Sequence, residues 1–62
     1  MKKYRCTYPL MLNIVGGGKY QIEVGEILDF EFQTDKITAL ENEHGRICVK
    51  NDLFEKYFEL AE

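Results

Sequence analysis

The sequence predicts a small, mainly β domain, built as a five-stranded barrel or a strongly bent antiparallel sheet and ending in a short α-helix. Apolar residues alternate with polar ones along most of the 62-residue chain, which is the pattern of half-buried strands. Turns that contain glycine separate the alternating stretches, and helical periodicity appears only near the C-terminus. A hydrophobic fraction of 45% suffices for one small core, so residues 1–62 are predicted to form a single domain.

The N-terminal segment predicts one or two strands. Residues 3–8 alternate, with Tyr4, Cys6 and Tyr8 on one side, and a strand at about 3–8 is expected. Pro9 lacks an amide hydrogen, so this strand ends there or continues as an edge strand. Residues 10–15 are the most apolar run of the chain. They are interpreted as a second strand or as one arm of a loop that closes in the glycines at 16–18.

The middle of the chain predicts two strands around a glycine turn. Between Tyr20 and Phe32 the apolar residues keep one parity on both sides of Gly25. Because glycine permits a positive φ or a bulge, strands at about 20–24 and 27–33 are expected, with a tight turn between them. Replacing Gly25 with valine is therefore expected to disrupt folding.

The C-terminal part predicts two further strands and the helix. Strands are expected at about 37–42 and 46–50, joined by a turn in which Gly45 takes a positive φ. Asp52 and Glu55 have the spacing of a capping box at the start of a helix over about 52–60. Phe54 and Phe58 belong to an apolar stripe at helical spacing, which must dock on the sheet because so short a helix does not persist alone.

The composition predicts neither a catalytic site nor a metal site. The chain has no serine, a single histidine, His44, and two cysteines, Cys6 and Cys48, that form no C-x-x-C pair. Gly18 and Lys19 lead into a predicted strand, whereas a phosphate-binding loop must open a helix. We therefore expect no catalytic residues, no metal ligands and no cofactor. The cysteines are interpreted as free thiols or small hydrophobes, and a disulfide between two barrel strands stays open as an alternative.

The chain shows no export signal and no apolar run long enough to cross a membrane. A cytoplasmic protein is therefore expected, in the cytoplasm of the host cell if the chain is phage-encoded. Residues 20–43 carry seven acids and a single lysine, within a net charge of −3. This excess disfavours a general nucleic-acid binder, which normally presents a basic stripe, although the charges are also explained as the solvent side of alternating strands.

Three surfaces are candidates for binding a partner. The apolar run before the glycines would contact a protein, or else complete the core or a dimer interface: Leu10, Met11, Leu12, Ile14 and Val15. The acidic face would suit a basic partner, even by imitating nucleic acid: Glu23, Glu26, Asp29 and Glu31. The basic-aromatic patch would contact phosphates and stack on bases: Lys2, Lys3, Tyr4, Arg5, Tyr8 and Lys19.

The expected function is therefore a non-catalytic protein-interaction module that binds an unknown protein or a second copy of itself. A small barrel that binds nucleic acid through the basic-aromatic patch is the alternative. An enzyme is not expected, because the carboxylates alternate along strands and so small a body leaves little room for a cleft.

Residues 22–30 resemble the diverging turn of the Src-homology-3 fold, with Ile22 three residues before Gly25 and an acidic residue after it. Residues 44–53 are similar to the last hairpin, strand and helical turn of that fold. The peptide-binding members also carry a tryptophan and a proline before the last turn. This chain has no tryptophan and has Lys50 at the place of that proline, so the resemblance does not imply recognition of proline-rich peptides. The whole chain is similar to small, uncharacterised barrel proteins of bacteria and their phages, and this similarity names no activity. A phage-type regulator or inhibitor of a host protein is a sub-case of the expected interaction module.

Overall fold

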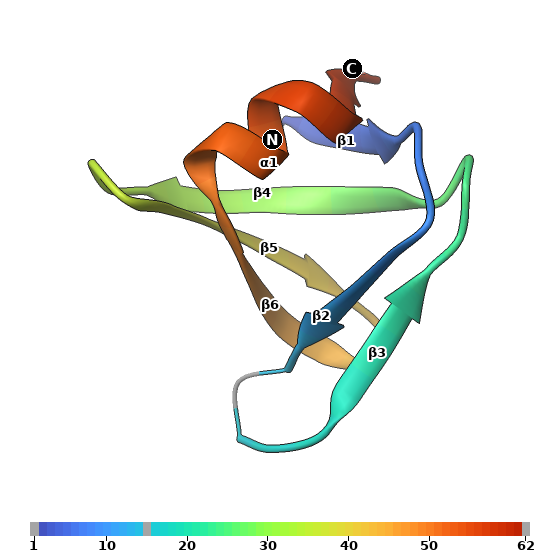
Figure 1. Ribbon diagram of the computed structural model, residues 1–62, viewed down its shortest axis with the longest axis vertical. Helices are drawn as coiled ribbons and strands as arrows, with labels where there is room; N and C mark the ends of the chain where they lie inside the picture. Colours follow the sequence, from blue (N-terminus) through green and yellow to red (C-terminus); the bar gives the residue numbers. More distant parts are fainter. Residues whose placement is uncertain (1, 15, 62) are drawn as a thin grey trace.

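The computed structural model describes residues 2–14 and 16–61. The described residues form β1 (Lys3–Cys6), β2 (Leu10–Asn13), β3 (Lys19–Ile22), β4 (Ile27–Gln33), β5 (Ile37–Asn42), β6 (Gly45–Lys50), α1 (Asn51–Tyr57) and β7 (Phe58–Leu60). All strand pairs are antiparallel, and they make one five-stranded sheet in the order β6-β5-β4-β1-β7 and a separate β2–β3 ribbon (Figure 1). The mainly β class with a short helix near the C-terminus is thus confirmed, but the described strands do not close into a barrel.

The ribbon meets the sheet through β2. An isolated antiparallel bridge pairs Ile14, just after β2, with Ile47 of β6. Figure 1 shows β2 on the side of the ribbon nearer to β6, with β3 on its outer side. Gly45 takes a φ of +129° in the β5–β6 turn, and a methyl group built there would lie 3.6 Å from Ile14. The β5–β6 turn thus also packs against Ile14, just after the ribbon strand β2.

The core lies between the sheet and the ribbon. Its buried members come from both, and they are Cys6, Ile22, Leu28, Leu40, Ile47, Val49 and Phe58. The predicted parity places Ile22 and Leu28 correctly, and Gly25 between them takes the expected positive φ of +92°. Most of these side chains are β-branched or long aliphatic groups, which pack well on a pleated surface.

Two residues depart from the predicted parity. Val24 is 61% exposed because β3 ends at Ile22, so Val24 belongs to the turn and no longer follows the strand period. Phe32 is exposed because the β4–β5 register shifts between Phe30 and Phe32, where a bulge reverses the face that follows it. Phe32 instead stands opposite Ala39 on the outer face of the sheet, and Ala39 is fully buried there.

The predicted helix over 52–60 is too long. Helix α1 ends at Tyr57, and β7 then pairs with β1, with Phe58 opposite Cys6 and Leu60 opposite Tyr4. The physical reason is that β1 has a second edge that needs backbone partners. The predicted capping box is also absent, because the side chain of Asp52 accepts only from the next amide, that of Leu53.

The other strand bounds differ at the ends. Strand β1 stops at Cys6 instead of reaching 8, β3 covers Lys19–Ile22 instead of 20–24, and β6 begins at Gly45 instead of 46. Strand β2 covers Leu10–Asn13, and its predicted end at residue 15 lies outside the described residues. Strands β4 and β5 have the expected bounds. Both cysteines are free thiols. No helix in the described part of the chain has the length and apolar character needed to cross a membrane.

Candidate functional site

A polar hollow opens where β3 faces the first residues of β4 and the last residues of β5. Its volume is about 470 Å³, and its lining consists of Lys3, Tyr20, Glu26, Ile27, Asp29, Glu41, Asn42 and Glu43. Four of these side chains are carboxylates and one is a lysine, so the hollow carries a negative charge. The hollow contains part of the predicted acidic face.

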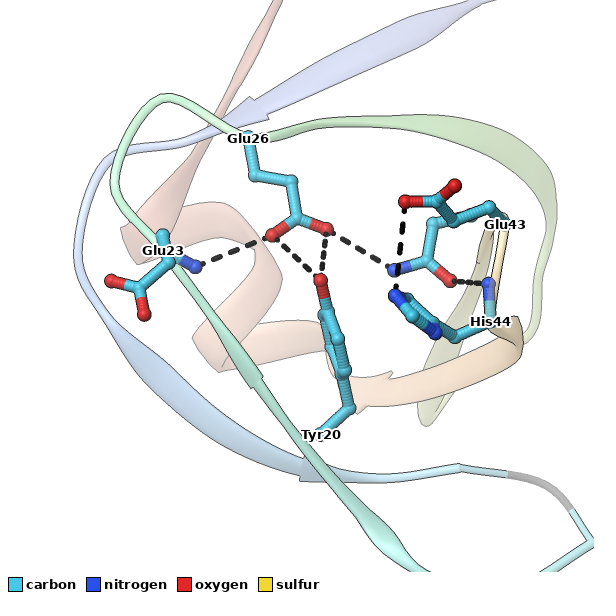
Figure 2. A network of polar contacts seen from close by, with 6 residues as sticks. Tyr20, Glu23, Glu26, Glu43 and His44 are labelled. Carbon is cyan, nitrogen blue, oxygen red and sulfur yellow. Dashed lines mark hydrogen bonds and ion pairs between the residues drawn. The ribbon is translucent and has the colours of Figure 1, made fainter.

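The carboxylate of Glu26 holds the walls of this hollow together (Figure 2). It accepts hydrogen bonds from the Tyr20 hydroxyl at 3.1 and 3.2 Å and from the side-chain amide of Asn42 at 3.1 Å, and a longer one of 3.4 Å from the backbone amide of Glu23. Asn42 in turn accepts from the backbone amide of His44 at 2.8 Å. One side chain therefore joins the ribbon, the Gly25 turn and the end of β5.

Burial raises the pKa of Tyr20, and the hydrogen bond to Glu26 and the negative charges of Glu26, Glu43 and Glu23 raise it further. The phenol therefore remains a neutral donor at physiological pH and is not activated as a base. Its ring lies 4.7 Å from the His44 ring, centroid to centroid. Both carboxylate oxygens of Glu26 accept hydrogen bonds from neighbouring side chains. The arrangement therefore suits a structural role beside a negatively charged surface.

The structure pairs two of the four residues of the acidic face with basic residues. Asp29 lies 2.9 Å from the ammonium of Lys3, and Glu31 lies 2.5 Å from the guanidinium of Arg46. The hydrogen bond and the charge of Glu31 raise the pKa of Arg46. Glu23 is exposed, and Figure 2 shows its carboxylate directed away from Tyr20 and Glu26.

The residues of the basic-aromatic patch do not gather on one surface. Besides the pairing of Lys3, Arg5 is bound to Glu59 of β7 at 2.8 Å. Tyr4 points toward the core, with its ring 4.8 Å from Phe54 and 5.9 Å from Phe30. The two remaining lysines, Lys2 and Lys19, are exposed near the N-terminus and at the start of β3.

The apolar run divides between the core and the surface. Leu10, Leu12 and Ile14 are partly buried and pack against the core, while Met11 points outward and is 59% exposed. Val15 lies outside the described residues. The structure thus places most of this run as core, the alternative weighed against a binding surface.

Sequence reasoning missed the pairing of Tyr8, a residue of the basic-aromatic patch, with Tyr57, which is partly buried against the core. Tyr8 is 54% exposed, and its ring stacks on that of Tyr57 with the centroids 4.8 Å apart. The amide and hydroxyl of Thr7 both donate to the carbonyl of Tyr57, at 2.7 and 2.9 Å, which fixes the end of α1 beside the end of β1. The ammonium of Lys56 lies 5.4 Å from the Tyr57 ring centroid. The β1–β7 pairing creates this pair, and no local pattern signals it.

Residues 2–14 and 16–61 bring together no group of three or more histidine, cysteine or acidic side chains that could hold a metal ion. No protein-family model, curated protein or solved structure matches the chain. The functional argument therefore depends on the geometry of the two surfaces: the polar hollow and the Tyr8–Tyr57 pair.

Proposed function

We propose that this protein is a non-catalytic protein-interaction module whose contact surface contains the Tyr8–Tyr57 pair. One observation carries the proposal: a large ring, 54% exposed, is held in a stack at the surface instead of being packed inside. Within the described residues neither hydroxyl makes a hydrogen bond. Tyrosine is enriched at protein interfaces because it supplies both apolar area and a polar tip.

The backbone around the pair supports a preorganised surface. The two hydrogen bonds from Thr7 and the pairing of Cys6 with Phe58 tie the end of β1 to the end of α1. Tyr57 is the last residue of α1, and Tyr8 lies in the bend that follows β1. A binding surface that is ordered before contact loses less conformational entropy on binding. This rigidity favours recognition over a purely solvent-facing role for the two rings.

We extend the proposal to a Src-homology-3-like architecture. The ribbon ahead of the Gly25 turn, the β5–β6 hairpin and the short helix that follows it support this likeness. A phage-type regulator or inhibitor of a host protein is a sub-case of this proposal, in which the acidic face would meet a basic partner. The two free thiols, Cys6 and Cys48, support a reducing, cytoplasmic location.

Affinity capture from the native host, followed by titration of the captured protein, tests the proposal. We expect Tyr8→Ser to weaken binding by about tenfold or more, because truncating a central aromatic contact costs over 1 kcal/mol. The control is Val24→Ser, which alters a side chain of similar exposure at the Gly25 turn. Equal affinities for Tyr8→Ser and the wild type would reject this surface, and capture of no protein would reject the interaction module.

We do not extend the proposal to nucleic acid, because Lys3 and Arg5 are already paired with Asp29 and Glu59. The test is a titration with single- and double-stranded DNA and RNA at about 50 mM salt, where electrostatic affinity is greatest. We expect no binding. Salt-sensitive binding that Lys19→Glu weakens would instead support the basic-aromatic alternative.

A further inference from the structure

Strand β3 has an edge that no other strand covers. In the described part of the chain β3 pairs with β2 alone, and Figure 1 shows it on the outer side of the ribbon. An uncovered edge presents backbone donors and acceptors that can pair with another strand. The question is which strand fits this edge.

The backbone of Gln21 points toward the open edge. Register pairs run from Leu10 opposite Ile22 to Asn13 opposite Lys19, and beyond them the Ile14 amide donates to the Gly18 carbonyl at 3.1 Å. Opposed residues in an antiparallel pair alternate between hydrogen-bonded and non-hydrogen-bonded positions. Counting from Gly18, the pair formed by Gln21 and Met11 is non-hydrogen-bonded, so the amide and carbonyl of Gln21 face away from β2.

We infer that β3 pairs antiparallel with β3 of a second copy, about a two-fold axis at Gln21. The two Gln21 residues then exchange both backbone hydrogen bonds. This register places Lys19 opposite Glu23 of the second copy, and Tyr20 opposite Ile22 of the second copy. The second copy is the occupant that the charges select, because one symmetric register satisfies both ends at once.

The charge pattern supports this register over other pairings. Lys19 and Gln21 are exposed and share one face of β3 by strand parity, and Glu23, which is also exposed, directly follows the last residue of the strand, Ile22. Neither Lys19 nor Glu23 forms an ion pair with any of the other residues described. In the dimer each Lys19 meets a Glu23, which gives two ion pairs on the face that looks outward.

Two other strands, β6 and β7, lie at the ends of the sheet, and the bridge from Ile14 to Ile47 already occupies the edge of β6. The β7 edge is unsuited to the same contact. Strand β7 is only three residues long, and its central residue is Glu59. A symmetric antiparallel pairing about this residue would set two Glu59 carboxylates side by side, and like charges directly opposite each other are destabilising. The ribbon edge is therefore the one that accepts a second copy.

Sedimentation equilibrium of the full chain tests the dimer, in a buffer of low salt so that exposed ion pairs are not screened. The contact is short, so we expect a monomer–dimer equilibrium with a midpoint between about 10 µM and about 1 mM. Lys19→Glu and Glu23→Lys should each weaken the dimer by about tenfold or more, since each reversal turns both ion pairs into like-charge pairs. The double variant Lys19→Glu/Glu23→Lys should restore the wild-type constant.

Lys36→Glu is the matched control, because it makes the same change in net charge at an exposed residue of the β4–β5 turn. It should leave the dimer unchanged. A mixed sample of labelled and unlabelled protein should also show an intermolecular contact between the α-protons of Tyr20 and Ile22, which face each other in the proposed register.

A wild type that stays monomeric up to about 1 mM would overturn the inference and show that the two charges protect the edge. Failure of the double variant to recover would overturn the register. Neither result bears on the Tyr8–Tyr57 surface, because no variant in the series alters it.

Discussion

Phe58 of β7 packs on α1 and pairs with β1, and replacing it with alanine tests how these three elements are held together. Phe58 is 8% exposed, and its ring stacks on that of Phe54 with the centroids 5.6 Å apart. In β7 it lies opposite Cys6 of β1. Removing a buried phenyl group costs about 3–5 kcal/mol. At about 0.05–0.15 kcal/mol per residue, a domain of this length is stable by only about 3–9 kcal/mol. We therefore expect Phe58→Ala to lose about a third or more of this stability, which would leave it unfolded at room temperature if the wild type lies at the lower end of the range.

The measurement is thermal and urea unfolding followed by circular dichroism. Leu60→Ala is the control, because Leu60 lies two residues along the same strand but is 59% exposed. It should lose less than about 1 kcal/mol. If Phe58→Ala and Leu60→Ala melted at the same temperature, the placement of Phe58 in the core and the β1–β7 pairing would both be wrong.

Three further perturbations test other parts of the fold. Gly25→Val places a branched side chain at a φ of +92°, where no steric clash adds to the backbone strain. We expect the free energy of unfolding in urea to fall by about 1–3 kcal/mol. An unchanged midpoint would contradict a positive φ at Gly25. Thr38→Val removes the buried hydroxyl that accepts from Gln33 and donates to Asn51, both at 2.8 Å, and should cost about 1–3 kcal/mol, whereas a neutral result would show that water replaces the hydroxyl. Burial raises the pKa of Cys6 above its ordinary 9.0, so the unfolded chain loses this proton at a lower pH than the folded chain, and the free energy of unfolding should fall from about pH 9 upward. Cys6→Ala should make this fall less steep. An equal slope in both proteins would show that other groups cause the fall.

Local patterns were enough to predict the class of the fold. Strands β4 and β5 have the predicted bounds because turn residues mark both ends of each strand. The glycine turns at Gly25 and Gly45 were also predictable, since a positive φ at these positions has a local cause. These features depend on neighbours in sequence, so the sequence alone contains them.

The boundary between α1 and β7 was not predictable in this way. Phe54 and Phe58 have helical spacing, while Phe58 and Leu60 have strand spacing, so the segment satisfies both periods. The choice is made by the free edge of β1, which lies more than fifty residues away in sequence. The exposure of Phe32 has a similar origin, because the bulge that turns it outward depends on the register of β4 against β5.

The candidate surfaces show the same limit. The sequence separates a basic N-terminal strand from an acidic central stretch and predicts them as alternative binding surfaces, one for nucleic acid and one for a basic partner. In the structure β1 lies between β4 and β7, so Lys3 and Arg5 meet Asp29 and Glu59 directly. The Tyr8–Tyr57 pair depends on the same sheet order, and only the long-range register brings its rings together.

The ribbon differs from the sheet in how its charges can be satisfied. Charged residues on the strands of the sheet pair within one molecule, whereas Lys19 begins β3 and Glu23 follows its last residue, four residues further along the chain. At about 3.3 Å per residue they are about 13 Å apart, beyond the reach of an ion pair, whereas the same spacing on a helix would bring them together. Only a strand from outside can bridge them, and an antiparallel copy of the same strand does so at both ends. The dimer register thus follows from one difference between ribbon and sheet: among the described residues Lys19 and Glu23 form no ion pair, whereas Lys3 and Arg5 of the sheet do.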